Sequence, residues 1–312
     1  MSEKSLAFIF PAFVSEYSED PGRRLPGFPK YFQKFLHQAA IRVSPDLEQF
    51  NFHTRTFLDD ELKTQFITYV CSCALSSYLK DEGIRSDYCA GYSMGIYAAF
   101  YHAGVVSFMD GLELIGRAFE SIRKVTRNAP FSMGTVIGLS REDIVGIIKH
   151  TGSSVQITNQ NGICSFVLGG KEDEIRSLLD AAKAEGALST RVIPVSDPYH
   201  TSYINPPGSD HRMIMTGLHF NDPMIPVVSL LDSKILHDEM SLRDEIIRNL
   251  YTPMNWYKTQ LLLQSRGISV FIECGMGKAL TKNSKFVEGD AVFLSPDSPG
   301  FIEDLEKIKP LL

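Results

Sequence analysis

Short apolar runs alternate along the chain with stretches whose apolar residues recur at helical spacing. Residues 6–10 form an apolar run of strand length that ends at Pro11, which lacks a backbone N–H and so stops the strand. Residues 61–80 place apolar side chains every three or four positions, and Gly83 follows, which predicts a long helix with a glycine stop. This alternation of strand and helix favours an α/β fold with a mainly parallel sheet.

The same criteria predict the remaining elements of the outer parts of the chain. Strands are expected at residues 87–91, 225–231, 269–273 and 292–294. Helices are expected at residues 30–40, 94–102, 109–126, 241–249, 255–266 and 301–308.

The middle of the chain has a different order. Strands are expected at residues 133–139, 155–158, 165–169 and 190–195, helices at 140–150 and 171–185, and a turn at 159–162. This β-α-β-β-α-β order is that of a ferredoxin-like unit. We therefore expect a ferredoxin-like subdomain of residues 130–196 inserted into a core made of residues 1–129 and 197–312.

Composition narrows the function classes. The chain has 312 residues, 44% apolar and 22% charged, and its formal net charge of -6 argues against a nucleic-acid-binding protein. The spacings of its five cysteines match no zinc or redox motif, so we expect reduced thiols and no metal site. No signal peptide and no apolar stretch of membrane-spanning length are seen, so we expect a cytoplasmic protein that binds neither nucleic acid nor a membrane.

Candidate chemistry begins with the segment Gly91-Tyr92-Ser93-Met94-Gly95, a GxSxG pattern between an expected strand and an expected helix. That context is the one a nucleophile elbow requires, where a sharp turn exposes the serine oxygen and small neighbours let the backbone pass closely. The alternative is a plain glycine-rich turn between strand and helix. We favour Ser93 as a nucleophile.

A serine nucleophile needs a general base, and the sequence holds eight histidines. His200 differs from the others because it ends a proline-containing loop, residues 194–200, just after the last expected strand of the subdomain, where catalytic groups tend to be presented. A loop histidine can also be merely solvated. Arg117 lies in an apolar helix and could bind a carboxylate through two hydrogen bonds, or could simply pair with Glu113 four residues earlier.

Together these segments resemble the malonyl-CoA:acyl carrier protein transacylase family of fatty acid and polyketide synthesis, over nearly the whole chain. The joint order of short motifs carries the resemblance. In chain order the motifs are Phe10-Pro11, Thr64-Gln65, Gly91-Tyr92-Ser93-Met94-Gly95, Arg117, Asn159-Gln160-Asn161-Gly162, Pro194-Val195-Ser196-Asp197-Pro198-Tyr199-His200, Phe220-Asn221-Asp222-Pro223, Pro226-Val227-Val228, Pro253-Met254-Asn255-Trp256 and Glu273-Cys274-Gly275-Met276-Gly277-Lys278.

The resemblance implies an α/β-hydrolase-like acyltransferase core around the inserted subdomain. It implies that Ser93 is acylated and that His200 is its general base, oriented by a backbone carbonyl from residues 250–252 rather than by an acid. It also implies an oxyanion hole made by the backbone N–H groups of Phe13 and Met94.

The resemblance further implies that Arg117 holds the carboxylate of a malonyl group, with Gln65 nearby in the pocket. Tyr199 is bulky, so we expect it to disfavour an α-methyl branch and to favour malonyl over methylmalonyl. Malonyl-CoA is the implied substrate, with no permanently bound cofactor. The implied partners are coenzyme A thioesters and a phosphopantetheinylated acyl carrier protein, and we expect a monomer.

The sequence departs from the family pattern at several positions. Residues 12–16 read Ala-Phe-Val-Ser-Glu where Gly-Gln-Gly-Ser-Gln is usual. Tyr92 replaces a histidine, Ile96 a glutamate and Met276 a proline, and residues 206–208 interrupt the segment after His200, where a helix is usual. These changes put the pocket shape and the carrier partner in question, but they leave the expected catalytic pair intact.

Three alternatives stay open. An acyl hydrolase of the same fold could clear acyl groups from carrier proteins, although simple acyl groups offer no carboxylate for Arg117. A relative that only binds a carrier protein could have lost its oxyanion hole through the altered residues 12–16. An unrelated serine esterase would need an acid such as Asp232, which follows the histidine in the wrong chain order.

Overall fold

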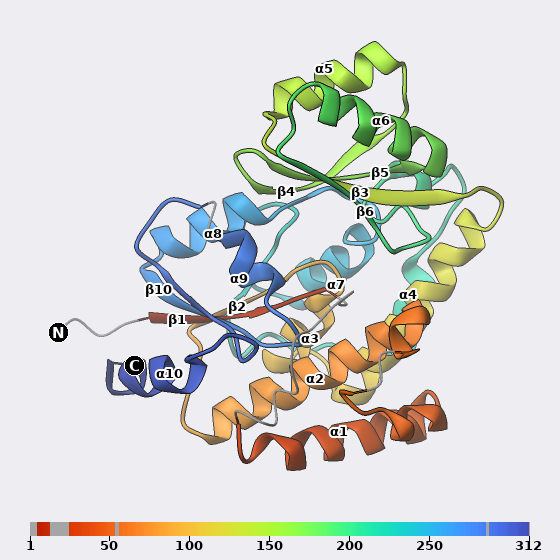
Figure 1. Cartoon of the computed structure of the whole chain (residues 1–312). Coiled ribbons are helices and arrows are strands. Elements are labelled where there is room, and N and C mark those ends of the chain that lie inside the picture. Colours follow the sequence, from red (N-terminus) through yellow and green to blue (C-terminus); the bar gives the residue numbers. More distant parts are fainter. Residues whose placement is uncertain (1–4, 13–24, 54–55, 285–286, 312) are drawn as a thin grey trace.

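Two β-sheets form the frame of the molecule (Figure 1). The computed structural model describes residues 5–12, 25–53, 56–284 and 287–311. In the first sheet the described strands lie in the order β11-β10-β1-β2-β7-β8. They are β1 (Ser5–Phe10), β2 (Tyr88–Gly91), β7 (Val227–Val228), β8 (Ile235–Leu236), β10 (Ile268–Glu273) and β11 (Val292–Leu294). Only the pairing of β7 with β8 is antiparallel among them, so the prediction of a mainly parallel sheet is confirmed.

Both faces of this sheet are buried, as strand β1 illustrates. Leu6, Phe8 and Phe10 belong to one apolar cluster, whereas Ala7 and Ile9 belong to another on the opposite face. Successive side chains of a strand point to opposite faces, so an unbroken apolar run is what a doubly covered strand needs.

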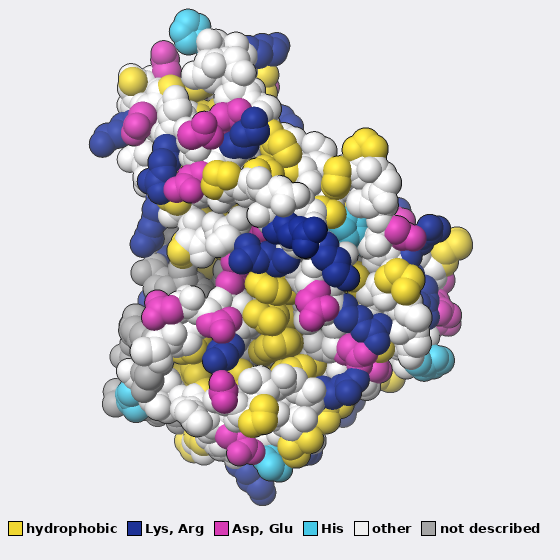
Figure 2. All heavy atoms as spheres, turned by 90° about the vertical axis from the view of Figure 1, so that its right-hand side faces the viewer, with side chains coloured by type: hydrophobic (Ala, Val, Ile, Leu, Met, Phe, Trp, Pro, Cys, Tyr) yellow, Lys and Arg dark blue, Asp and Glu magenta, His cyan; other side chains and the backbone are white. Residues whose placement is uncertain are grey.

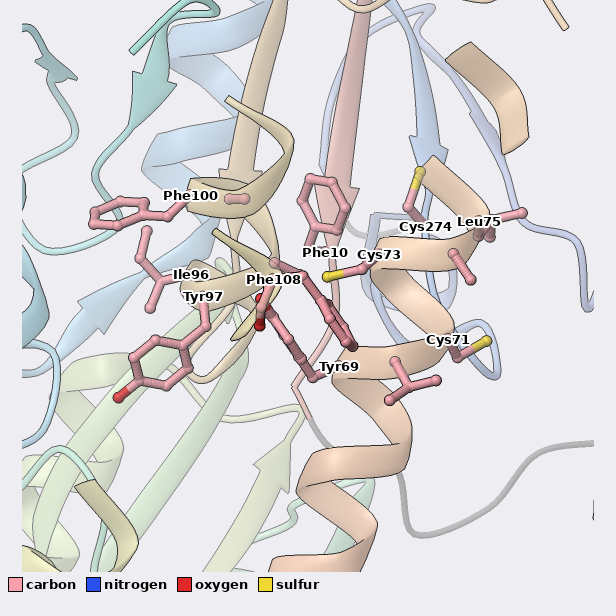
Figure 3. Close-up of a cluster of buried hydrophobic side chains, with 14 of the residues drawn as sticks. Phe10, Tyr69, Cys71, Cys73, Leu75, Ile96, Tyr97, Phe100, Phe108 and Cys274 are labelled. Atoms are coloured by element: carbon pink, nitrogen blue, oxygen red, sulfur yellow. The ribbon is translucent and has the colours of Figure 1, made fainter. Parts of the chain in front are cut away.

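Helices cover the two faces unequally. The face with Phe10 packs against α1 (Phe28–Arg42), α2 (Glu61–Asp81), α3 (Gly95–His102) and α4 (Phe108–Thr126). Figure 3 shows part of this cluster, where Tyr69 and Cys73 of α2 approach Phe10, and where Ile96 and Phe100 extend from α3. The other face packs against α8 (Trp256–Ser265) and α9 (Ala279–Asn283).

The second sheet has the strand order β6-β3-β5-β4-β9 among the described residues. Its strands are β3 (Phe131–Ile137), β4 (Gln156–Gly162), β5 (Ser165–Lys171), β6 (Ser189–Ile193) and β9 (Met254–Asn255). Helices α5 (Arg141–Thr151) and α6 (Glu172–Ala184) pack on one face of it. Strand β9 comes from the far part of the chain and runs parallel to β4, so residues 130–196 do not complete this sheet alone. The division into two domains stays our interpretation.

The turn expected at residues 159–162 is wrong. These residues belong to β4, which continues to Gly162, and the chain reverses between that strand and Ser165. Asparagine and glycine favour turns locally. Here, pairing of β4 with both β5 and β9 and the buried contacts of Asn159 and Asn161 outweigh that preference.

The remaining described elements lie between these strands and helices or at the end of the chain. They are α7 (Glu239–Arg248), α10 (Phe301–Ile308) and the short 3₁₀ helices η2 (Pro45–Gln49), η3 (Thr56–Asp59), η4 (Ser202–Ile204), η5 (Arg212–Met215) and η7 (Lys309–Leu311). The strand expected at residues 225–231 is reduced to the two residues of β7. None of the five cysteines forms a disulfide, and Cys164 is half-buried whereas the other four are buried.

Candidate active site

The serine of the GxSxG segment sits on a tight turn between β2 and α3. Ser93 has a φ of 55°, in the left-handed region that non-glycine residues seldom adopt. A Cβ at Gly91 would lie 2.3 Å from the backbone of Ile96, and a Cβ at Gly95 would lie 2.2 Å from the carbonyl oxygen of Phe10. Only glycine fits at either place, so both glycines allow the strained turn that presents Ser93.

The serine is paired with His200. Its Oγ lies 2.8 Å from Nε2 of His200, although the two residues are 107 positions apart in the chain. His200 also has a positive φ, 61°, and its backbone N–H donates to the carbonyl of Leu250 at 3.0 Å. Strained backbone at two residues that meet is typical of a functional site.

Glycine in the second sheet lets the histidine loop approach. A Cβ at Gly169 of β5 would lie 2.9 Å from the methyl carbon of Thr201 and 3.7 Å from the carbonyl oxygen of Tyr199. The loop that holds His200 therefore packs directly on this sheet.

Burial sets the charge state of the histidine. His200 is 3% exposed, and this burial lowers its pKa to about 4, partly offset by the neighbouring backbone of Thr252 and Asn249. Its Nδ1 makes no hydrogen bond of ordinary geometry with the described residues. A neutral imidazole at pH 7 is the form that can accept a proton from a serine.

No carboxylate of the described residues hydrogen-bonds to His200. Asp197, three residues earlier, is fully buried, but its carboxylate accepts from Thr126 and lies 3.5 Å from Arg123. Asp232, the acid that an unrelated serine esterase would require, is paired with Arg248 at 2.8 Å and with Lys234 at 3.0 Å. The arrangement is a serine–histidine pair faced by backbone rather than an acid-containing triad.

One of the two expected donors of the oxyanion hole, Met94, lies among the described residues. The backbone N–H of Met94, directly after Ser93, donates to none of the described residues. Phe13, the other expected donor, lies outside the described residues.

Tyr199, which directly precedes His200, contacts Gln65 of α2. Gln65 Nε2 donates to the phenol oxygen of Tyr199 at 3.4 Å, and the phenol donates to the carboxylate of Glu61. Burial raises the pKa of Glu61, and burial followed by the charge of Glu61 raises the pKa of Tyr199. Glu61 was not anticipated from the sequence, where its only signal is its place one turn before Gln65 on α2.

Arg117 is hydrogen-bonded to residues other than the Ser93–His200 pair. Within the described residues its guanidinium donates to Glu113 and to the carbonyls of Ile214 and Thr216, not to Ser93 or His200. The ion pair with Glu113 is the alternative that helical spacing indicated. The neighbouring turn at η5 therefore positions this side chain.

Asn249 was not anticipated. Its Nδ2 donates to the backbone carbonyl of Ser93 at 3.3 Å, and its own backbone lies beside His200. It immediately precedes the segment 250–252 that the resemblance singled out, which is the only signal the sequence offers.

Comparison with known proteins identifies the family. The malonyl CoA-acyl carrier protein transacylase of Synechocystis sp. is 30% identical over 220 residues, which cover 70% of this chain and 72% of that protein. The chain belongs to the malonyl-CoA:acyl carrier protein transacylase family. The enzyme of the same name from Bacillus subtilis is 25% identical over 304 residues, covering 96% and 95% of the two chains. No family model matches the chain.

Solved structures agree on the fold. A malonyl-transacylase determined in complex with its type II PKS acyl-carrier protein superposes with a TM-score of 0.86 at 24% identity, covering 97% of this chain and all of that one. Two of the departures from the transacylase pattern lie in the apolar core. Ile96 and Met276 are each 1% exposed and belong to the core, so they act on packing rather than on substrate directly.

The described residues also bear on membranes and metals. No helix there has the length and apolar character needed to cross a membrane. No group of three or more His, Cys, Asp or Glu side chains there could hold a metal ion.

Proposed function

We propose that this chain transfers a malonyl group from malonyl-CoA to the phosphopantetheine thiol of an acyl carrier protein, in fatty acid or polyketide synthesis. The observation that carries the proposal is the 2.8 Å contact between Ser93 Oγ and His200 Nε2 at a nucleophile elbow. Membership of the transacylase family supplies the reaction class.

The first half-reaction forms an acyl-enzyme. Ser93 Oγ attacks the thioester carbonyl of malonyl-CoA while Nε2 of neutral His200 takes the hydroxyl proton. The N–H of Met94 is placed to stabilise the oxyanion of the tetrahedral intermediate. When the C–S bond breaks, the imidazolium returns its proton to the thiolate of coenzyme A, and malonyl-Ser93 is left.

The second half-reaction reverses these steps. The phosphopantetheine thiol of the carrier protein attacks the ester, His200 takes the thiol proton, and Ser93 leaves with that proton restored. Water must be kept from the ester, because it would convert the transfer into hydrolysis. Arg117, through donors that its protein partners leave free, would hold the malonyl carboxylate.

Basic side chains on one face of the molecule favour the binding of anionic substrates. Figure 2 shows the side of the molecule on which Figure 1 places α4, and Lys and Arg side chains gather across the middle of that face. For a chain of net charge -6, a local positive field is what attracts the phosphates of coenzyme A and of a phosphopantetheine arm. The monomeric state and the cytoplasmic location stay predictions.

Intact-mass spectrometry tests the proposal. We expect the chain incubated with malonyl-CoA to gain one malonyl group and to pass it to an added phosphopantetheinylated carrier protein. Ser93→Ala should abolish the adduct, and His200→Ala should slow its formation by about 10²–10⁴-fold.

The chain contains a matched control for these variants. Ser86 Oγ lies 2.8 Å from Nε2 of His102, and both residues are buried. Ser86→Ala thus removes the serine of a second serine–histidine pair that has no nucleophile elbow, and it should leave the malonyl adduct unchanged. Hydrolysis of acyl groups without transfer would instead identify an acyl hydrolase, and no adduct from any acyl donor would indicate a chain that only binds a carrier protein.

A further inference from the structure

The residue before the nucleophile is tied to the second sheet. The phenol of Tyr92 donates to Oδ1 of Asn161 at 3.1 Å and accepts from Nδ2 of Asn159, and both asparagines lie on β4. Asn159 Nδ2 also donates to Asn161 Oδ1 at 2.8 Å. The phenol and the two amides form a closed triangle of hydrogen bonds between the nucleophile turn and β4.

The two asparagines of the triangle lie in the interior of the protein, and Tyr92 is half-buried. Asn159 is 2% exposed and Asn161 is 5% exposed. Burial raises the pKa of Tyr92 to about 12, so its phenol stays protonated and can donate and accept at once. A buried polar group is costly unless it is hydrogen-bonded, and here each member satisfies the others.

Strand β4 is also hydrogen-bonded to β9, which follows the segment behind His200. Asn159 Oδ1 accepts from the backbone N–H of Trp256 at 3.4 Å, and Gln160 accepts from the side chain of Asn255 at 3.2 Å. Strand β9 pairs with β4 through this register. Thr252, whose backbone faces His200, lies two residues before β9. Strand β4 is therefore fastened on one side to the turn of Ser93 and on the other to the segment behind His200.

We propose that Tyr92 is a positioning residue, which clamps the turn of Ser93 to β4 and so sets the contact between Ser93 and His200. This inference rests on the proposed role of that pair. It also gives a function to the segment Asn159-Gln160-Asn161-Gly162, which lines a seam between the two sheets and is not a turn. The phenol acts only through its neighbours and touches no reacting atom.

The test measures how fast Ser93 reacts with a fluorophosphonate, a probe that needs the serine and its base but no malonyl group. In that reaction the serine oxygen bonds to phosphorus, fluoride leaves, and His200 receives the proton. Small misplacements of reacting groups cost large factors in rate, so Tyr92→Phe should slow labelling at least about ten-fold. The kcat for malonyl transfer should fall with it, while KM for malonyl-CoA stays nearly constant.

Tyr97→Phe is the control. Tyr97 is a buried tyrosine on α3, 3% exposed, whose phenol makes no hydrogen bond with the described residues. Its loss should leave the labelling rate within about two-fold of the native rate. Equal rates for the two variants would overturn the proposal, as would a Tyr92→Phe protein whose melting temperature falls but whose labelling rate at 25 °C is native.

A second variant covers the case in which Tyr92→Phe does not fold. Asn161→Ala removes the acceptor of the phenol and keeps the ring, and the same loss of labelling rate is expected. The outcomes also separate the clamp from the proposed function. Normal fluorophosphonate labelling without malonyl transfer in the native chain would count against the function, whereas native malonyl transfer in Tyr92→Phe would count against the clamp.

Discussion

The guanidinium of Arg117 is paired with Glu113, which lies one turn earlier on α4. It also donates from Nη1 to the carbonyls of Ile214 at 3.2 Å and Thr216 at 2.6 Å. A guanidinium has five N–H donors, and the described residues engage three of them. The two that are left, on Nε and Nη2, could bind a carboxylate, which would make Glu113 and the turn at η5 an orienting support in the proposed function.

Arg117→Ala should therefore reduce the preference for malonyl-CoA over acetyl-CoA. Losing charged hydrogen bonds of about 1.5–3 kcal/mol corresponds to about 10- to 150-fold in the ratio of kcat/KM values. Lys124→Ala, at an exposed position of the same helix, should leave the ratio unchanged. An unaltered ratio in Arg117→Ala would show that another group holds the malonyl carboxylate.

Tyr199 should set the size of the acyl pocket. Tyr199→Ala is expected to raise kcat/KM for methylmalonyl-CoA relative to malonyl-CoA about ten-fold or more, because one methyl group in a pocket is worth roughly 1–3 kcal/mol. Tyr199→Phe keeps the ring and should keep the preference for malonyl. If both variants retain that preference, the side chain does not contact the α-carbon of the acyl group.

The lowered pKa of His200 predicts an acid-tolerant nucleophile. Desolvation disfavours the imidazolium, so the base stays neutral until the pH falls towards about 4, well below the 6.5 of a free histidine. The rate of Ser93 labelling by a fluorophosphonate, measured from pH 4 to 8, should decline only as the pH approaches about 4. A labelling rate that declines below about pH 6.5 would mean that His200 is solvated when it acts.

The same shift has a consequence for stability. Between about pH 4 and 6.5 the unfolded chain binds more protons at His200 than the folded chain does. The stabilisation from keeping this histidine neutral is therefore fully present above pH 6.5 and is lost as the pH falls towards 4. In urea denaturation, the free energy of unfolding should fall less from pH 7 to pH 5 in His200→Gln than in the native chain.

Gly95 should be intolerant of any side chain. A Cβ there would lie 2.2 Å from the carbonyl oxygen of Phe10, so Gly95→Ala must displace β1 or α3, at a cost of about 1–3 kcal/mol or more in the free energy of unfolding. Gly146→Ala is the matched control, since a Cβ in α5 there meets nothing within 4 Å and should stabilise by about 0.5–1 kcal/mol. Equal stabilities of the two variants in urea denaturation would contradict the steric argument.

Local patterns predicted most elements to within a few residues. Strand β11 and helix α10 have the expected bounds, and α2 differs by one residue at its end. Strands β8 and β9 were not expected, because two-residue strands have no apolar periodicity of their own and form only where a neighbouring strand pairs with them. The turn expected at residues 159–162 failed for the same kind of reason, since the partners of Asn159 lie far away in the chain.

Spacing alone was enough to indicate Ser93, because a nucleophile elbow is a local structure whose glycines and strand-to-helix context are all within one short segment. The fold class also follows from local order, since alternating strands and helices have few ways to pack. Local patterns indicated His200 and the pairing of Arg117 with Glu113, but they left alternatives open. The tertiary structure decided that His200 meets Ser93, that carbonyls at η5 also bind Arg117, and that Tyr92 reaches β4. Each of these long-range contacts joins segments that are about 70 to 110 positions apart in the chain, whose local sequences contain no information about one another.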